Sequence, residues 1–214
     1  GAEIMFGALD DPASLKRAVK GCEVVFHLAG ATKALDENSF AAVNTGGTRA
    51  LGEAAASSPV LRRFVFVSSL AACGPSPDGK PLVETCEPDP VSLYGKSKLD
   101  AEALLRESDL PVVIVRPPAV YGPGDRDMFS LFQMASRGVF PRIGDDARRI
   151  SLIHVHDLAC GLLRAAQAQP GGVYFLADPR IYTDDAIKQV LERVFDRRLV
   201  PLPVSFHLFR YIAV

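Results

Sequence analysis

Hydrophobic residues in this chain gather in short continuous runs, and these runs alternate with longer segments of mixed character. Three runs, at 23–30 (EVVFHLAG), 64–69 (FVFVSS) and 112–115 (VVIV), are rich in Val and Phe. Continuous apolar runs of this length are typical of strands that are buried on both faces of a parallel sheet. The same pattern predicts further strands at 2–6, 150–155 and 173–177.

The segments between these strands carry apolar residues at helical spacing. Asp11 followed by Pro12 is typical of a helix start, because the Asp side chain caps the first turn and Pro fits its first position. The stretch 74–91 is too rich in proline for regular structure. Alternating strands and helices imply an α/β fold, with right-handed crossovers and helices on both faces of a parallel sheet. Helices are predicted at 12–20, 37–57, 94–107, 128–137, 157–167 and 184–196.

Composition narrows the class of protein. The 214 residues are 48% hydrophobic and 23% charged with a net charge of -1, as is ordinary for a globular enzyme. The basic residues are dispersed, and no apolar run reaches the length of a membrane span, so we expect neither a nucleic-acid nor a membrane partner. No leader segment opens the chain, which predicts a cytoplasmic protein. The four cysteines form no CxxC pair, and Cys22 and Cys160 are expected to be small core residues.

Candidate chemistry lies at the end of the strand at 64–69 and at the start of the helix at 94–107. Ser68 and Ser69 end that strand, so they lie at the carboxyl edge of the sheet, where open α/β sheets bind ligands. Tyr94 and Lys98 are four residues apart and share one face of the helix. A free phenol with a pKa of about 10 is a poor base at neutral pH, and a nearby ammonium lowers that pKa. Alone, a Tyr and a Lys at this spacing are weak evidence.

Ordered motifs span nearly the whole chain. Ser69 precedes the Tyr94 of a YxxxK motif by about 25 residues. Four further motifs lie before and after this pair along the chain: VVFHLAG (24–30), VNTGGTRALGEAA (43–55), VRPPAVYGPGD (115–125) and SLIHVHDLA (151–159). Together they resemble the extended short-chain dehydrogenases/reductases of the NAD-dependent epimerase/dehydratase type. The resemblance implies a Rossmann-like doubly wound parallel sheet with helices on both faces and a small C-terminal substrate lobe.

The resemblance also assigns roles to residues. It implies that Ser69, Tyr94 and Lys98 form a catalytic triad that works with NAD or NADP, and that Lys98 also donates hydrogen bonds to the nicotinamide ribose. From the pattern alone, Asn44 is equally consistent with a solvated position on a helix. The resemblance places it near that ribose. The implied cofactor-binding residues are Leu9, Leu28, Ala29, Gly30, Asn44, Tyr94, Lys98, Pro118 and Val120, and the implied substrate-binding residues are Ser69, Ala119 and Arg149.

The pyrophosphate-binding part of a dinucleotide fold is not recognised in this sequence. Such folds open with a strand, a glycine-rich turn and a helix, whereas Gly46-Gly47 lies in a predicted helix and Gly122-Pro123-Gly124 follows a late strand. Set against the family, residue 1 falls near the third strand. We therefore expect a fragment without the N-terminal βαβ segment, incomplete at its C-terminus and a weak binder of cofactor. Residues 1–122 would form a partial dinucleotide-binding domain, and 123–214 would contribute to the main sheet and the substrate lobe.

The resemblance implies an NAD(P)-dependent epimerase/dehydratase-type oxidoreductase that acts on a nucleotide sugar or a related alcohol or ketone. Ala119 stands where many nucleotide-sugar epimerases carry Asn, and Ile150 stands where they often carry Arg, although Arg149 is adjacent. These departures favour a 3β-hydroxysteroid-dehydrogenase-like or other ketone reductase. A non-catalytic dinucleotide-sensing or scaffold protein is a further alternative, against which the intact triad argues.

Other chemistry-bearing residues read as structural. His154 and His156 lie two apart in a strand-like segment and would share one face, but no third ligand accompanies them, so no metal site is predicted. Asp157 is expected to cap a helix, and His27 is expected to be a core or strand-end histidine. The expected partners are a small-molecule substrate and a second copy of the chain, since family members often form homodimers through helices such as 37–57 and 94–107.

Overall fold

The computed structural model describes residues 2–143 and 149–204. The chain divides into two compact units. Gly1–Pro118 and Ala159–Leu176 form the first unit, and Ala119–Leu158 and Ala177–Val214 form the second. The three residues of the predicted triad all belong to the first unit.

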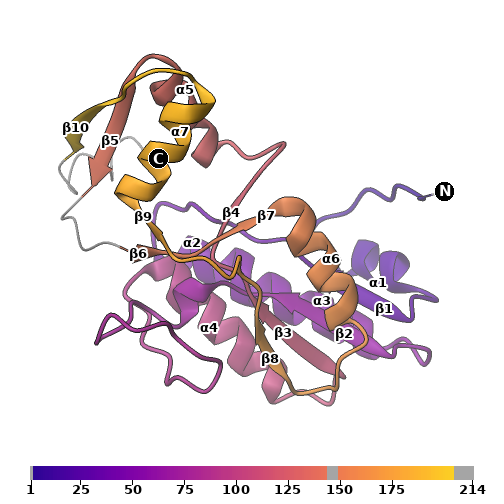
Figure 1. Ribbon diagram of the computed structural model, residues 1–214. Coiled ribbons are helices and arrows are strands. Elements are labelled where there is room, and N and C mark those ends of the chain that lie inside the picture. The colour runs from indigo at the N-terminus through magenta and orange to yellow at the C-terminus, as the bar shows by residue number, and fades with distance from the viewer. Residues whose placement is uncertain (1, 144–148, 205–214) are drawn as a thin grey trace. The chain divides into compact units, whose positions relative to one another are not determined.

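A four-stranded parallel sheet forms the centre of the first unit (Figure 1). The inner strand β2 (Arg63–Val67) is buried at Phe64, Val65 and Phe66, as expected where helices cover both faces of a sheet. Phe64 is aligned with Val25 on one side and with Val112 on the other. The Rossmann-like parallel sheet is thereby confirmed. Its strands, in spatial order, are β1 (Val24–His27), β2 (Arg63–Val67), β3 (Val112–Arg116) and β8 (Val173–Phe175).

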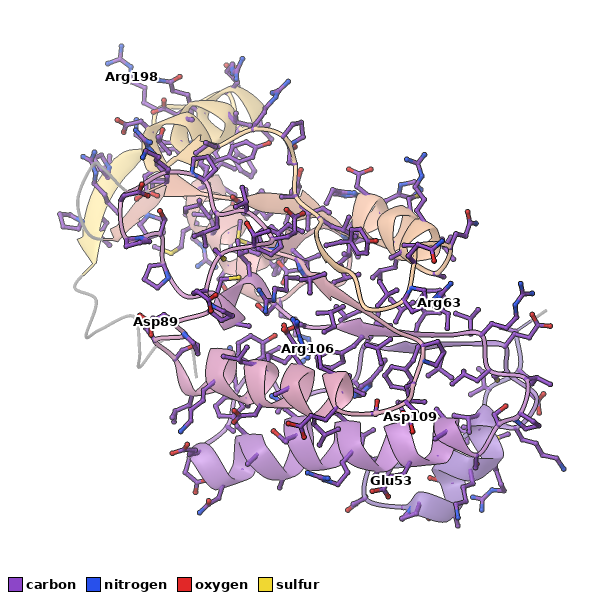
Figure 2. The ribbon with its side chains drawn as sticks, turned by 90° about the horizontal axis from the view of Figure 1, so that it is seen from below. Glu53, Arg63, Asp89, Arg106, Asp109 and Arg198 are labelled. Carbon is purple, nitrogen blue, oxygen red and sulfur yellow. The ribbon has the colours of Figure 1, made fainter. Side chains whose placement is uncertain are left out.

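Three helices pack on one face of this sheet: α1 (Pro12–Val19), α3 (Gly47–Ala56) and α4 (Leu93–Arg106). Figure 2 shows α3 and α4 side by side along that face. The small residues Ala55 and Ala101 join Leu105 in a core cluster with Phe64 and Phe66, so the helices approach the aromatic side chains of β2 closely. The Ala159–Ala165 part of α6 (Val155–Ala165) lies on the opposite side of the sheet from α4 in Figure 2.

The helix predicted at 37–57 is continuous but changes type along its length. It consists of α2 (Glu37–Phe40), a π-helical segment (Ala41–Gly46) and then α3. The Asp36 side chain caps its start by accepting a hydrogen bond from the Ser39 amide at 2.7 Å. π-helical turns are rare and occur frequently at functional sites, and here the turn contains Asn44.

The strand predicted at 2–6 is wrong. These residues form no ladder with any strand in the described part of the chain, and Ile4 and Phe6 are 82% and 90% exposed. Apolar content alone does not make a strand, because the backbone groups need a neighbouring strand as hydrogen-bond partner. Among the described residues, β1 is an edge strand that pairs with β2 alone.

The described part of the second unit contains short paired strands, the helices α5 and α7, and the start of α6. A small core forms around Ala135, Phe140, Leu191 and Leu199. The strand predicted at 150–155 is two strands, and α6 begins at Val155. The helix predicted at 184–196 ends at Val194. The elements are β4 (Ala119–Tyr121), α5 (Asp127–Ser136), β5 (Val139–Ile143), β6 (Arg149–Ile150), β7 (Leu152–His154), β9 (Tyr182–Thr183), α7 (Asp184–Val194) and β10 (Val200–Val204), in which β4 pairs with β7, β5 with β10 and β6 with β9.

Candidate active site

The end of β2 and the start of α4 are held together by backbone packing. A 3-10 turn (Leu70–Ala72) follows Ser69, and the Ser92 hydroxyl caps α4 by accepting a hydrogen bond from the Gly95 amide at 3.0 Å. A Cβ atom on Gly95 would lie 2.2 Å from the Ala71 carbonyl oxygen, so a side chain has no room there. Glycine at this position therefore lets the first turn of α4 rest on the backbone that follows Ser69.

This packing brings Ser69 and Tyr94 together. The Tyr94 side chain is largely buried, and burial raises the pKa of its phenol, while a side-chain hydrogen bond with Ser69 acts in the opposite direction. The Ser69 oxygen also accepts a hydrogen bond from the Ala71 amide at 3.1 Å, which fixes its orientation. The two hydroxyl groups predicted to act on one substrate oxygen are thus neighbours.

Lys98 lies on the same helix, 4% exposed. Its Nζ donates a hydrogen bond to the Val67 carbonyl at 2.8 Å and lies 4.7 Å from the centre of the Phe66 ring. Burial lowers the pKa of Lys98 to about 8, and the charge of Glu102 partly opposes that shift.

One expectation about Lys98 and Tyr94 is not met. We expected the Lys98 ammonium to lower the pKa of Tyr94, but burial dominates that pKa and the opposing effect comes from Ser69. The physical reason is the direction of the Lys98 side chain, whose ammonium is bonded to the strand-end carbonyl of Val67.

Asn44 joins the segment after β1 to α4. Its Oδ1 accepts from the Ala31 amide at 2.7 Å, while its Nδ2 donates to the Ala31 carbonyl at 3.0 Å and to the Ser97 hydroxyl at 2.8 Å. A Cβ on Gly30 would lie 2.9 Å from Asn44 Oδ1 and 3.6 Å from Lys98 Nζ. Asn44 is therefore buried and fully bonded, which excludes the solvated helix position that the pattern alone allowed.

His27 is the buried last residue of β1, as predicted. Its Nε2 hydrogen-bonds the Thr48 hydroxyl at 2.9 Å, and that hydroxyl donates to the Asn44 carbonyl. Burial, with a smaller effect from the Lys98 charge, lowers the pKa of His27 to about 4. The imidazole is thus neutral at physiological pH. The sequence did not indicate the contact with Thr48.

The remaining predicted site residues are in varied settings. Leu28 and Ala29 are exposed beyond the end of β1, and Pro118 is half-buried at the end of the first unit. The Leu9 side chain packs against Gly47 of α3 and is part of the core, so only its backbone remains for a cofactor. The predicted residues Ala119, Val120 and Arg149 lie in the second unit, in β4 and β6, and their roles stay predictions.

Three minor expectations are corrected. His154 ends β7 whereas His156 lies in α6, so the two do not share a strand face. Asp157 lies inside the first turn of α6 and is not its cap, because the helix begins at Val155. Cys160 is exposed on α6, while Cys22 packs against the core as expected.

Two features are absent from the described residues 2–143 and 149–204. No cluster of three His, Cys, Asp or Glu side chains there is arranged to hold a metal ion. No helix there combines the length and apolar character needed to cross a membrane.

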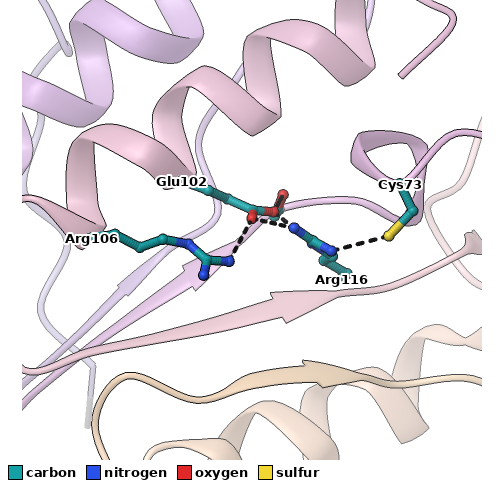
Figure 3. A network of polar contacts seen from close by, with 5 residues as sticks. Cys73, Glu102, Arg106 and Arg116 are labelled. Carbon is teal, nitrogen blue, oxygen red and sulfur yellow. Dashed lines mark hydrogen bonds and ion pairs between the residues drawn. The ribbon is translucent and has the colours of Figure 1, made fainter. Parts of the chain in front are cut away.

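Sequence analysis missed a buried polar network beside these residues. It joins Glu102 of α4 to Arg116 at the end of β3, with Cys73 and Arg106 in contact (Figure 3). The only available signal was the position of Glu102, one helical turn after Lys98, and helix positions of this kind are usually solvated.

Comparison with known proteins agrees with this architecture. The family model described as NAD dependent epimerase/dehydratase family matches residues 2–177. A ceramide reductase of Caulobacter vibrioides is 38% identical over 178 residues, which cover 83% of this chain and 51% of the reductase. A 4-hydroxy-2-methyl-3-oxo-4-farnesyl-3,4-dihydroquinoline-1-oxide ketoreductase of Stigmatella aurantiaca is 34% identical over 189 residues, covering 83% and 55%. The chain thus spans about half the length of these relatives.

Among solved structures, UDP-glucuronic acid 4-epimerase from Bacillus cereus in complex with NAD superimposes with a TM-score of 0.81 and 22% identity. The match covers 91% of this chain and 67% of the epimerase, and shows a common fold. With the family model matched over most of the sequence, the chain belongs to the NAD-dependent epimerase/dehydratase family of extended short-chain dehydrogenases/reductases.

Proposed function

We propose that the protein carrying this chain is an NAD(P)-dependent oxidoreductase that transfers a hydride at a substrate hydroxyl or carbonyl carbon, with Ser69, Tyr94 and Lys98 as its catalytic residues. Two observations support the proposal together with family membership: the interaction between Ser69 and Tyr94, and the hydrogen bond of the Lys98 ammonium to the Val67 carbonyl at the end of β2. A bound nicotinamide cofactor would supply the redox step.

The residues present fit the nicotinamide and ribose end of such a cofactor. Gly30 lies so close to Asn44 Oδ1 and Lys98 Nζ that a side chain has no room there, and the neighbouring Leu28 and Ala29 are exposed. An ammonium has three protons to donate, and Lys98 uses one on the Val67 carbonyl. The others are available for ribose hydroxyls.

Side chains of this chain carry out the proton transfer. Tyr94 donates a proton to the substrate oxygen in reduction and removes it in oxidation, and Ser69 hydrogen-bonds the same oxygen. The raised pKa of Tyr94 suits the donor role at neutral pH, because the phenol stays protonated until substrate binds.

A ketone with a large apolar part is the substrate class that we favour. The ceramide reductase and the farnesyl-dihydroquinoline-oxide ketoreductase support it, and so do Ala119 and Ile150, which replace polar residues that many nucleotide-sugar epimerases carry. Epimerisation of a nucleotide sugar is the second candidate, which the description of the matching family favours. The same three side chains would serve it.

The test compares Tyr94→Phe with the unchanged protein in two assays, oxidation of reduced cofactor in the presence of long-chain ketones and, separately, epimerisation of UDP-sugars followed by NMR of the sugar products. We expect Tyr94→Phe to lose most turnover, by at least about a hundredfold, while cofactor affinity is retained. Tyr174→Phe, in β8, is the matched control and should stay active. Full activity of Tyr94→Phe would refute the proposal, and cofactor binding without turnover on any substrate would favour a dinucleotide-sensing protein.

A further inference from the structure

A buried ion pair lies one helical turn beyond Lys98. Glu102 of α4 is fully buried and Arg116 is 2% exposed. Arg116 binds the carboxylate through two hydrogen bonds, from Nε to Oε1 at 2.8 Å and from Nη2 to Oε2 at 2.6 Å. Its Nη1 lies 3.1 Å from the Cys73 sulfur, as Figure 3 shows. Paired hydrogen bonds of this kind fix both side chains in one geometry.

Two more donors complete the surroundings of the carboxylate. The Ser68 hydroxyl donates to Oε1 at 2.5 Å, and Nη2 of the half-exposed Arg106 lies 3.3 Å from Oε2. Every group in contact with the two oxygens is a donor, so an acceptor-only carboxylate is the form that matches this site. The network therefore keeps the Glu102 side chain of α4 as a buried carboxylate.

That charge acts on Lys98. The two residues are four apart on α4 and share one helix face. The contacts of the Lys98 ammonium, the Val67 carbonyl and the Phe66 ring, are neutral. Burial lowers the pKa of Lys98 to about 8, and the Glu102 charge raises it.

The other titratable groups around Lys98 do not replace Glu102. His27 of β1 is neutral, since its pKa is about 4, and Tyr94 of α4 has a raised pKa and is a neutral phenol. The π-helical segment contributes the uncharged Asn44.

We propose that Glu102 is a positioning residue for the catalytic triad, and that its buried carboxylate, locked by Arg116 and Ser68, keeps Lys98 in the ammonium form. The inference rests on the proposed function, in which the Lys98 ammonium donates hydrogen bonds to the cofactor ribose. Without the carboxylate, Lys98 would lose the nearby anion and would face the unpaired charge of Arg116. Both changes favour the neutral amine.

The experiment is an NMR titration of protein labelled with ¹³C at the lysine Cε. The Lys98 signal is identified by its absence in Lys98→Arg. We expect a midpoint of about 8 in the unchanged protein. In Glu102→Gln we expect a proton affinity about tenfold weaker, with the midpoint one pH unit lower.

Two control variants separate charge from packing. Ser68→Ala removes a hydrogen bond to Glu102 but keeps the carboxylate, and Arg106→Gln removes the half-exposed cation. Both should leave the Lys98 midpoint in place. If Ser68→Ala lowers the midpoint as far as Glu102→Gln does, a packing effect replaces the proposed charge effect and the proposal is overturned.

Glu102→Gln leaves Arg116 buried without a partner and can fail to fold. The double variant Glu102→Gln/Arg116→Gln removes both charges and should also lower the Lys98 midpoint, because the nearby anion is gone. An unchanged midpoint in a folded variant overturns the inference. The titration requires no turnover, so activity of Tyr94→Phe would refute the proposed function alone, whereas an unmoved Lys98 midpoint would refute this inference alone.

Discussion

Acid should destabilise the first unit through one histidine. His27 is 1% exposed, and its pKa falls from 6.5 to about 4 mainly because the charged imidazole would be buried. A depressed folded-state pKa means that the unfolded chain binds a proton at a pH where the folded chain does not. Stability from this group is therefore complete above pH 6.5 and is lost as the pH falls towards 4.

The magnitude follows from the two pKa values. A difference of about 2.5 pH units corresponds to about 3 kcal/mol, most of which is lost between pH 6.5 and 4. The group is buried, so solvent screening removes little of this free energy. Carboxyl groups also titrate in this pH range. The loss of stability due to His27 must therefore be isolated by comparing the unchanged protein with a His27 variant.

We would measure urea unfolding by far-UV circular dichroism at pH 7.5 and at pH 4, for the unchanged protein and for His27→Gln. Gln retains a group that can donate to the Thr48 hydroxyl but does not titrate. The unchanged protein should lose about 3 kcal/mol more than the variant on acidification. Equal losses in the two proteins, or an imidazole NMR titration with a midpoint near 6.5, would refute the reasoning.

Further predictions concern close packing and hydrogen bonds at the site. Gly95→Ala should destabilise the fold by about 3 kcal/mol in urea unfolding, since its Cβ would lie 2.2 Å from the Ala71 oxygen, and Gly52→Ala on α3, whose Cβ would find ordinary contacts, should not. Gly30→Ala should weaken cofactor binding about tenfold, measured by fluorescence titration with NADH and NADPH, and unchanged affinity would exclude Gly30 from the cofactor site. Asn44→Ala should cost about 2 kcal/mol in the same unfolding assay, because partners on Ala31 and Ser97 are left buried, and a neutral effect would show that water replaces the amide.

Sequence alone predicted those parts of the fold that depend on local chemistry. The Asp11 cap and Pro12 mark the start of α1, where the Asp11 side chain accepts hydrogen bonds from two backbone amides. The apolar runs predicted β1, β2 and β3 because a strand buried on both faces has no polar positions. The strand at 2–6 was wrong because pairing depends on a neighbouring strand and not on the apolar residues themselves.

The candidate site was predicted as a set of residues but not as an electrostatic arrangement. Spacing placed Tyr94 and Lys98 on one face of a helix, and the strand end supplied Ser69. The sequence did not indicate that Lys98 donates a hydrogen bond to the Val67 carbonyl or that Glu102 is buried. Both facts depend on how β2, β3 and α4 pack. The π-helical turn at Asn44 was missed for a similar reason, since its apolar spacing differs little from that of an α-helix.

The central claim is that Ser69 and Tyr94 act on one substrate oxygen. The most direct measurement is the single-turnover rate of hydride transfer in Ser69→Ala, Tyr94→Phe and the double variant, at saturating cofactor and substrate. Groups that act as one unit are not additive, so the double variant should be about as slow as the slower single variant. Rate losses that multiply in the double variant, or a Ser69→Ala protein with an unchanged rate, would contradict the account.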